Sequence, residues 1–267
     1  MTISILGCGW YGKALALALM NDSYKVKGSA TSTEKLETLA ELGIEPFLVN
    51  FKADEENYEP GFFTCDVLIV SISPRTRHGE GGDYLPKIQR IIDATVRHKV
   101  QKVIYISSTA VYGENCSRVT EVDTPDSKSA TLLLQAEGLF SGQSALKTTI
   151  VRFGGLVGPG RHPGRFFAGK KDIPNGQSPV NLVHLDDCIG ITQAIISQNK
   201  FGLIINGVAP HHPAKMTFYT RATAQATLDA PQFIDELNAW KIIDSTVLPL
   251  ELNYRFHTPN WDDCVFT

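Results

Sequence analysis

The stretch Ile3-Ser4-Ile5-Leu6-Gly7-Cys8-Gly9-Trp10-Tyr11-Gly12 is a short apolar strand that leads directly into G-x-G-x-x-G, and the helical run 13–20 follows at once. In such a turn, Gly7 permits the tight bend, Gly9 lets backbone N–H groups approach a pyrophosphate, and Gly12 lets the helix pack closely on the strand. The helix N-terminus supplies partial positive charge to phosphates. The alternative is three glycines in an ordinary strand-to-helix turn. The strand before and the helix after favour a dinucleotide-binding turn that includes Trp10 and Tyr11.

Length and charge limit the classes of function. With 267 residues, 43% of them hydrophobic, the chain can bury one large core or a core plus a small appended lobe. The formal net charge is −3 and the pI is about 6.2, so no basic field invites nucleic acid or an anionic membrane. We therefore expect a small-molecule substrate, no nucleic acid and no membrane partner. The oligomeric state stays open, with a homodimer as one option.

The N-terminal residues and the cysteines indicate a cytoplasmic protein. The first twenty residues are apolar, but they lack a basic segment and contain three glycines, which is unlike a secretion signal. No run of about 18 apolar residues occurs elsewhere. The five cysteines are scattered and have no C-x-x-C spacing, so they are predicted to be free thiols in a reducing compartment.

Strand and helix patterns alternate through the first half of the chain. Strands are predicted at 3–6, 24–29, 44–49, 66–71, 102–107 and 148–153, and helices at 13–20, 33–42, 83–98 and near 129–139. This alternation predicts right-handed βαβ units and an α/β Rossmann fold with a doubly wound parallel sheet. A ligand then lies across the carboxyl ends of the strands, where Gly9, Ser71, Ser73, Ser108 and Phe153 are expected to converge.

The second half changes character. Residues 154–176 are rich in Gly, Pro, Arg and His and are predicted to form a functional loop. A strand over 179–185, a helix from Asp186 to about 198, a strand over 203–206 and helices over 214–228 and 231–237 are expected, followed by an irregular tail. We predict a dinucleotide-binding Rossmann core over 1–153. A small interleaved C-terminal substrate lobe covers 154–267, of which about 179–206 returns to the core sheet.

Four motifs occur in the order and at the spacing of extended short-chain dehydrogenases. They are Gly7-x-Gly9-x-x-Gly12, Ser107-Ser108-Thr109-Ala110-Val111-Tyr112-Gly113, the stretch VRFGGLVGPGRHP from Val151 to Pro163, and NLVHLDD from Asn181 to Asp187. The chain most resembles the atypical, YeeZ-type branch of this family, also described as NAD-dependent epimerase/dehydratase-like. The resemblance covers nearly the whole chain, including Lys241 to Asp244, where it implies the start of the last helix. It implies a bound NAD or NADP and a nucleotide sugar or related carbonyl compound as substrate.

The chain departs from that family at its catalytic pair. Related enzymes use Tyr-x-x-x-Lys, in which the lysine lowers the pKa of the tyrosine so that the phenolate takes a hydroxyl proton. Counting back from Glu137 places Ser129 at the tyrosine position and Leu133 at the lysine position. Ser108 matches the family's catalytic hydroxyl and is our first catalytic candidate, with capping of the backbone as its alternative. Tyr112 is the second, with packing as its alternative.

The remaining candidates concern substrate and cofactor. Arg161, His162 and Arg165 form a cationic cluster suited to a substrate phosphate or carboxylate, unless they are solvated loop charges. No metal site is expected. Beside the glycine turn, the cofactor is predicted to contact Ser71, Ser73, Ser107 and Phe153. The tip of the second strand carries Thr31 and Ser32 with no acid, which favours NADP over NAD.

Two classes of function remain open. One is an NAD(P)-dependent oxidoreductase or epimerase-like enzyme with an unusual proton donor. The other is a protein that binds the nucleotide without turnover, as a sensor or regulator.

Overall fold

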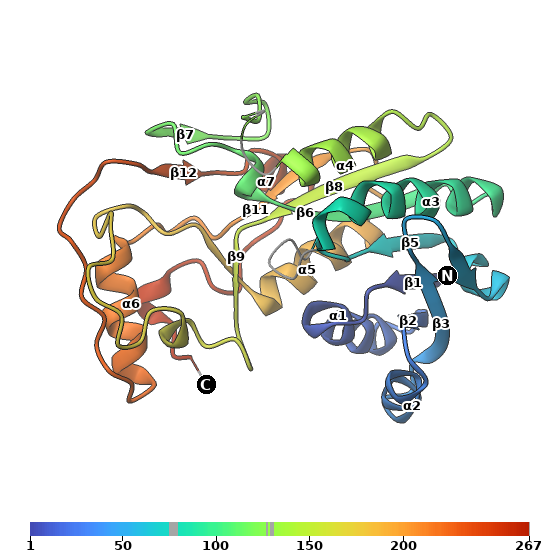
Figure 1. Cartoon of the computed structure of the whole chain (residues 1–267), viewed down its shortest axis with the longest axis horizontal. Coiled ribbons are helices and arrows are strands. Elements are labelled where there is room, and N and C mark those ends of the chain that lie inside the picture. The colour runs from blue at the N-terminus through green and yellow to red at the C-terminus, as the bar shows by residue number, and fades with distance from the viewer. Residues whose placement is uncertain (75–79, 127, 129–130, 267) are drawn as a thin grey trace. The chain divides into compact units, whose positions relative to one another are not determined.

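The structure is a computed structural model that describes residues 1–74, 80–126, 128 and 131–266 (Figure 1). Its strands are β1 Thr2–Leu6, β2 Lys25–Ala30, β3 Glu45–Phe51, β4 Glu56–Tyr58, β5 Val67–Val70, β6 Lys102–Ser108, β7 Ser117–Val119, β8 Lys147–Phe153, β9 Gly155–Val157, β10 Leu182–His184, β11 Ile204–Gly207 and β12 Lys241–Ile243. Its α-helices are α1 Trp10–Asn21, α2 Thr33–Glu41, α3 Tyr84–Arg97, α4 Thr131–Ser141, α5 Leu185–Ser197, α6 Lys215–Gln225 and α7 Val247–Glu251.

One large sheet carries the fold, with strand order β11-β8-β6-β5-β1-β2-β3-β4. The ladders from β3 through β2, β1 and β5 to β6 are parallel, whereas β4 joins β3 antiparallel. The chain moves from β1 to β2 and β3 on one side and then crosses to β5 on the other side of β1. This reversal of strand order is where a doubly wound sheet binds its ligand. The predicted fold class is confirmed.

The chain divides into two compact units. The first contains residues 1–107, 130–151 and 195–204, and the second contains 108–129, 152–194 and 205–267. This division differs from the predicted boundary at 153, because the segment after β6 leaves the large sheet and its strand β7 pairs with β12 from near the C-terminus. Strand β11, at the end of the segment 179–206 that was expected to return to the core sheet, lies beside β8 in the large sheet.

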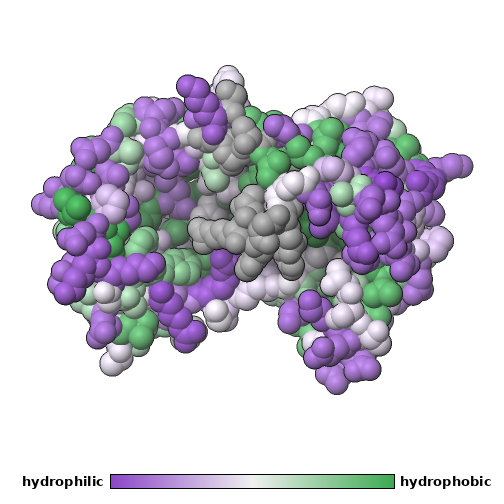
Figure 2. Space-filling view, in the orientation of Figure 1, coloured by the Kyte–Doolittle hydropathy of each residue, from purple (hydrophilic) through white to green (hydrophobic). Residues whose placement is uncertain are grey.

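The core of the first unit explains why its elements form where they do. Strands β1 and β5 are almost continuous apolar runs with Ile3, Ile5 and 67–70 buried, as expected for strands covered on both faces. Helices α3 and α4 lie side by side and pack their apolar faces on the sheet (Figure 1). The outward faces of α2 and α3 are mainly hydrophilic (Figure 2).

A separate apolar cluster holds the second unit together. Helix α6 contributes Phe218, Tyr219 and Ala222, which pack with the fully buried Trp261 and with Phe266 near the C-terminus. Phe218 meets the rings of both Trp261 and Phe266 edge-on. The unit is therefore closed by residues that are distant in sequence.

Four stretches of the second half differ from the prediction. Residues 231–237 form no helix; Phe233 instead makes an isolated bridge to Ile173. Residues 241–243 are the strand β12 rather than the start of a helix. The tail is not irregular throughout, because it contains α7 and a short 3₁₀-helix at Trp261–Asp263. The predicted loop 154–176 likewise contains β9 and a 3₁₀-helix at Pro163–Phe166.

Candidate dinucleotide site

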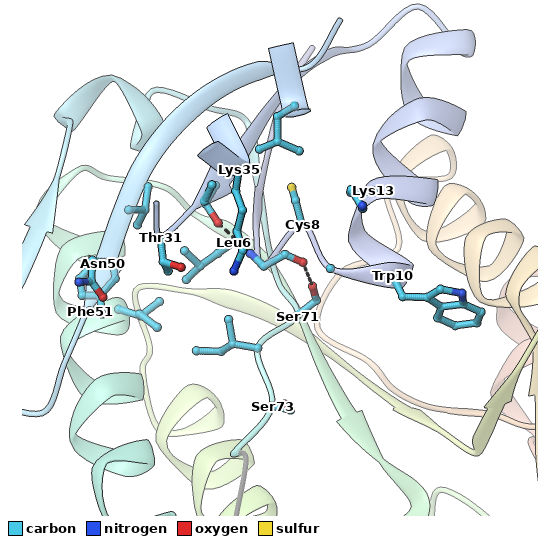
Figure 3. A pocket seen from close by; sticks show the side chains of 18 of the residues that line it. Leu6, Cys8, Trp10, Lys13, Thr31, Lys35, Asn50, Phe51, Ser71 and Ser73 are labelled. Carbon is cyan, nitrogen blue, oxygen red and sulfur yellow. Dashed lines mark hydrogen bonds between the residues drawn. The ribbon is translucent and has the colours of Figure 1, made fainter. Parts of the chain in front are cut away.

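A pocket of about 750 Å³ lies in the first unit at the carboxyl ends of β1, β2 and β5 (Figure 3). Of the residues predicted to bind the cofactor, the pocket is lined by Gly7, Gly9, Trp10, Thr31, Ser71 and Ser73. Side chains from α2 and α3 also line the pocket. Its volume is in the range of cofactor-binding sites.

The three glycines of the turn have distinct steric surroundings. Gly7 has a φ of +107°, which side-chain-bearing residues rarely adopt, and a Cβ on it would lie 2.9 Å from the Ser71 carbonyl oxygen. A Cβ on Gly12 would lie 2.3 Å from the Gly7 carbonyl oxygen, so only glycine lets α1 pack this closely on β1. A Cβ on Gly9 would meet nothing within 4 Å. The open space is therefore at Gly9, the residue expected to face the pyrophosphate.

Helix α1 begins directly after Gly9, which is its N-cap and provides no side-chain cap. The N-terminus of a helix presents N–H groups and a partial positive charge, which favours a phosphate at this end. Trp10 and Tyr11 occupy the first helical positions. Tyr11 is buried, whereas Trp10 is half-buried and points away from the labelled side chains of the α2 side of the pocket (Figure 3).

Two serines of the pocket bond to the Gly7 backbone. The Ser71 hydroxyl donates to the Gly7 carbonyl oxygen at 2.8 Å, and the Gly7 N–H donates to the Ser29 hydroxyl at 2.9 Å (Figure 3). The sequence predicts that Ser71 contacts the cofactor. Ser71 does line the pocket, but its hydroxyl hydrogen is directed at the turn.

Lysine side chains line the pocket, and one of them lies on its α2 side. Lys35 extends from α2 into the pocket toward Thr31 and the glycine turn (Figure 3), and Lys13 and Lys87 also line the cavity. The described residues that line the pocket include no carboxylate. Ser32, which was predicted to bind the cofactor, does not line the pocket; it is the N-cap residue of α2 and makes no side-chain cap bond. The α2 side therefore suits a phosphate better than an uncharged ribose edge alone.

Sequence reasoning missed several lining residues, notably Cys8, Lys13, Lys35, Asn50, Phe51 and Lys87. The spacing of Lys35 and Thr38, one helical turn apart, is the one signal that places both on the same face of α2. Cys8 lies within the turn, and burial raises the pKa of its thiol to about 11. Cys8 is thus a neutral packing group at neutral pH and no nucleophile.

Ser107 and Ser108 mark the carboxyl end of β6. Ser107 is buried and donates to the Oε1 atom of Glu137, itself buried in α4, at 2.5 Å. The Ser108 hydroxyl accepts from the Ala110 N–H at 3.2 Å and caps the short 3₁₀-helix at Thr109–Val111. Ser108 thus makes the capping contact that was its alternative role. Its hydroxyl keeps its own hydrogen for donation, because capping uses an oxygen lone pair.

Leu133 occupies the place of the family's lysine, and it packs half-buried against the apolar core of the first unit. Ser129, at the place of the tyrosine, lies outside the described residues. The usual pair is therefore absent, and in the described part of α4 the polar group on this face is Glu137, one turn beyond Leu133.

Tyr112 lies in the second unit and is 2% exposed. Its hydroxyl donates toward the Thr120 carbonyl and the Asn206 Oδ1 atom, at 3.0 and 3.1 Å, and accepts from the Arg152 guanidinium at 2.7 Å. Burial raises the pKa of this hydroxyl. These are the contacts of a packed structural tyrosine, the alternative that the sequence left open.

The predicted substrate loop is also in the second unit. Arg161 and Arg165 are exposed, and Arg165 is in the 3₁₀-helix at Pro163–Phe166. His162 differs from expectation because it is buried, its Nδ1 atom accepts from the Gly164 N–H, and its ring packs edge-on against Phe266. Burial and Arg165 lower its pKa, so at neutral pH it is uncharged. The positive charge of the cluster therefore comes from the two arginines.

Phe153, predicted to contact the cofactor, is buried in the second unit and does not line the pocket. Its carbonyl accepts from the Thr109 hydroxyl at 3.5 Å. Within the described residues, no group of three or more His, Cys, Asp or Glu side chains is arranged to hold a metal ion. No helix of the described chain is long and apolar enough to cross a membrane.

Comparison with known proteins identifies the family of the chain. The sequence profile of a family described as NAD(P)H-binding matches residues 7–181. The chain belongs to this NAD(P)H-binding family. It is 35% identical to protein YeeZ of Escherichia coli K12, over 97% of this chain and 96% of that protein. The resemblance to the YeeZ-type branch is thereby confirmed.

Solved structures show the same fold. A conserved protein of unknown function from Silicibacter pomeroyi has a TM-score of 0.78 at 23% identity, covering 97% of this chain and 95% of that one. UDP-glucuronic acid 4-epimerase from Bacillus cereus, solved in complex with NAD, has a TM-score of 0.76 at 20% identity and covers 98% and 95%. The chain therefore shares the overall fold of these proteins.

Proposed function

We propose that this protein is an NAD(P)-dependent oxidoreductase or epimerase-like enzyme that acts on a nucleotide sugar or a related carbonyl or hydroxyl compound, with NADP(H) as its cofactor. The observation that carries the proposal is the pocket at the reversal of strand order, with its glycine turn open at Gly9. A bound nicotinamide supplies hydride transfer. The chain itself must supply the binding and the orientation of cofactor and substrate.

The α2 side of the pocket supports NADP(H) over NAD(H). NAD-binding relatives of this fold place an acid here to hold the ribose hydroxyls, and its charge repels a 2′-phosphate. Here Thr31 offers a hydroxyl and Lys35 an ammonium group, and no carboxylate is present among the described lining residues. We assign Lys35 as the cation at the 2′-phosphate and Thr31 as its hydrogen-bonding neighbour.

The substrate class rests on charge and on likeness to structural neighbours. One neighbour of this fold is an epimerase of UDP-glucuronic acid, crystallised with that sugar nucleotide and NAD. In this chain Arg161 and Arg165 are exposed on one glycine-rich loop. Two guanidinium groups suit a diphosphate, because each donates a fork of N–H groups to phosphate oxygens. We propose that they bind the anionic part of the substrate.

We assign Ser108 as the residue that hydrogen-bonds the reacting oxygen. It ends the strand β6 and retains a donor hydrogen while it caps Ala110. The usual proton acceptor is missing, because the sequence has Ser129 in place of the tyrosine and Leu133 in place of the lysine that lowers the tyrosine pKa in related enzymes. Proton transfer then proceeds through the substrate or solvent, which makes the reaction slower than in relatives that hold the pair.

Cofactor binding is tested by Gly9→Asp, which places a side chain and a negative charge at the open position of the turn. Titration followed by intrinsic tryptophan fluorescence, to which Trp10 beside the pocket contributes, should show saturable NADPH binding for the wild type and none for the folded variant. Unchanged affinity in Gly9→Asp would refute the assignment of the pocket.

The same titration decides the cofactor. Wild type should bind NADPH more tightly than NADH, and Thr31→Asp should reverse the order by repelling the 2′-phosphate. An exposed residue outside the pocket, Lys25, provides the control variant Lys25→Asp. If wild type binds NADH tenfold more tightly, about 1.4 kcal/mol, the NADP assignment is wrong.

A second function is favoured by one observation. Leu133, which packs half-buried against the core, stands where a catalytic lysine belongs, which is the state expected of a protein that has lost the usual activity. In that case the chain binds NAD(P)(H) as a sensor or regulator. Saturable cofactor binding without turnover of any nucleotide-sugar or small carbonyl compound would favour this alternative.

A further inference from the structure

Hydroxyl groups from two different strands hold the backbone of Gly7. Ser29, in β2, accepts the Gly7 N–H at 2.9 Å, and Ser71, directly after β5, donates to the Gly7 carbonyl oxygen at 2.8 Å. In the sheet, β2 and β5 lie on opposite sides of β1. The two peptide groups that flank Gly7 are therefore fixed from both sides.

The Gly7 carbonyl is the centre of the turn. It also accepts the N–H of Gly9 at 2.9 Å, and it lies where a Cβ on Gly12 would have to be. Its orientation thus sets the path of the chain to Gly9 and the start of α1. Glycine is the residue with the most backbone freedom, so a glycine turn without such bonds loses the most entropy when it is fixed.

We propose that Ser29 and Ser71 are positioning residues that hold the glycine turn in its pyrophosphate-binding conformation before the cofactor arrives. This inference rests on the proposed function. Ser71 acts through Gly7 and not by contact with the ribose. Ser29 uses an oxygen lone pair for Gly7 and keeps its own hydrogen, which it can donate within the pocket that it lines.

Different residues hold the pyrophosphate and the 2′-phosphate of the cofactor. The turn faces the pyrophosphate, whereas the 2′-phosphate end is attributed to Thr31 and Lys35. We call Ser29 and Ser71 the clamp serines. Loss of either hydroxyl should therefore weaken the binding of ligands that carry a diphosphate. It should not change the affinity for a ligand that carries only adenosine and its 2′-phosphate. A general loss of structure would weaken both kinds of ligand.

The experiment is a titration of Ser71→Ala and Ser29→Ala with NADPH, ADP and 2′-AMP. One neutral hydrogen bond corresponds to an affinity change of about three- to tenfold. We expect that loss for NADPH and ADP and no change for 2′-AMP. Ser71→Thr, which keeps the hydroxyl, should restore most of the affinity.

Ser4→Ala is the matched control. Ser4 is a fully buried serine of β1, and its hydroxyl donates to the Phe62 carbonyl at 2.5 Å, away from the turn. It should lower stability without changing affinity for the three ligands. Three results would overturn the proposal. They are an affinity for NADPH unchanged in both Ser29→Ala and Ser71→Ala, an affinity for 2′-AMP that falls as much as that for NADPH, or a loss of NADPH affinity in Ser4→Ala as large as in these two variants. If the wild-type protein binds neither NADPH nor NADH, the proposed function is wrong, and this inference is wrong with it.

Discussion

At the scale of single residues, Ser108 is the side chain on which we expect the reaction rate to depend most. Ser108→Ala removes both the cap on Ala110 and the hydrogen that we assign to the reacting oxygen. We expect kcat to fall by about 10² with cofactor affinity unchanged, as for the loss of a positioned hydrogen-bond donor. The measurement is single-turnover oxidation of NADPH across nucleotide-sugar ketones and small carbonyl compounds. Ser129→Ala should do little, because the place of the lysine is taken by Leu133. A large loss in Ser129→Ala with none in Ser108→Ala would reverse the assignment.

Roles that depend on neighbouring residues in the chain can be predicted from the sequence. Residues that reach the pocket from distant elements are harder to predict. The steric demands on Gly7 and Gly12 follow from the strand, turn and helix around them, and the structure has both at close backbone contacts. Lys35 and Asn50 were missed because they reach the pocket from α2 and β3, and no pattern near the glycines announces them. His162 was misjudged for a related reason, since its burial depends on Phe266, more than a hundred residues away.

At the scale of elements, the contact of α1 with β1 depends on the absence of a side chain at Gly12. Alanine favours a helix over glycine by about 0.5–1 kcal/mol, but its Cβ would lie 2.3 Å from the backbone oxygen of Gly7. Because backbone cannot move aside as a side chain can, the clash wins and Gly12→Ala should lower the free energy of unfolding by about 1–3 kcal/mol. Gly138→Ala in α4, where a Cβ meets nothing within 4 Å, should raise it. Urea unfolding measures both, and equal effects would show that packing at Gly12 is not limiting.

Elements of the first unit could be predicted because their patterns are complete within short stretches. The apolar run 67–70 and the periodic helix α3 need no distant partner to be recognised. In the second unit, β7 and β12 have three residues each and pair across more than a hundred residues, so neither shows a strand pattern by itself. The predicted helix over 231–237 failed for the same reason, since most of the backbone hydrogen bonds of this segment join it to 170–177.

At the scale of the whole molecule, two histidines whose side chains are largely shielded from water, His162 and His212, link stability to pH. Burial lowers the pKa of His162, with Arg165 as a further cause, and burial also lowers the pKa of His212. His212 faces Asp244, 3.7 Å from its Nε2 atom, with Arg118 and His211 nearby, and its Nδ1 atom bonds to the Val180 carbonyl.

The direction of the pH effect follows from these two shifts. Because the folded-state pKa values lie below the unfolded value of about 6.5, the unfolded chain binds more protons as the pH falls through 6.5. The histidine contribution to stability is therefore complete above pH 7 and is lost on acidification. The free energy of unfolding, measured with urea, should be lower at pH 5 than at pH 7.5, a window above the ordinary pKa values of carboxylates. The double variant His162→Asn with His212→Asn keeps an acceptor for Gly164 and a donor for Val180 but cannot titrate, so its stability should change less over this range. An equally steep decline in the double variant would place the titrating groups elsewhere in the chain.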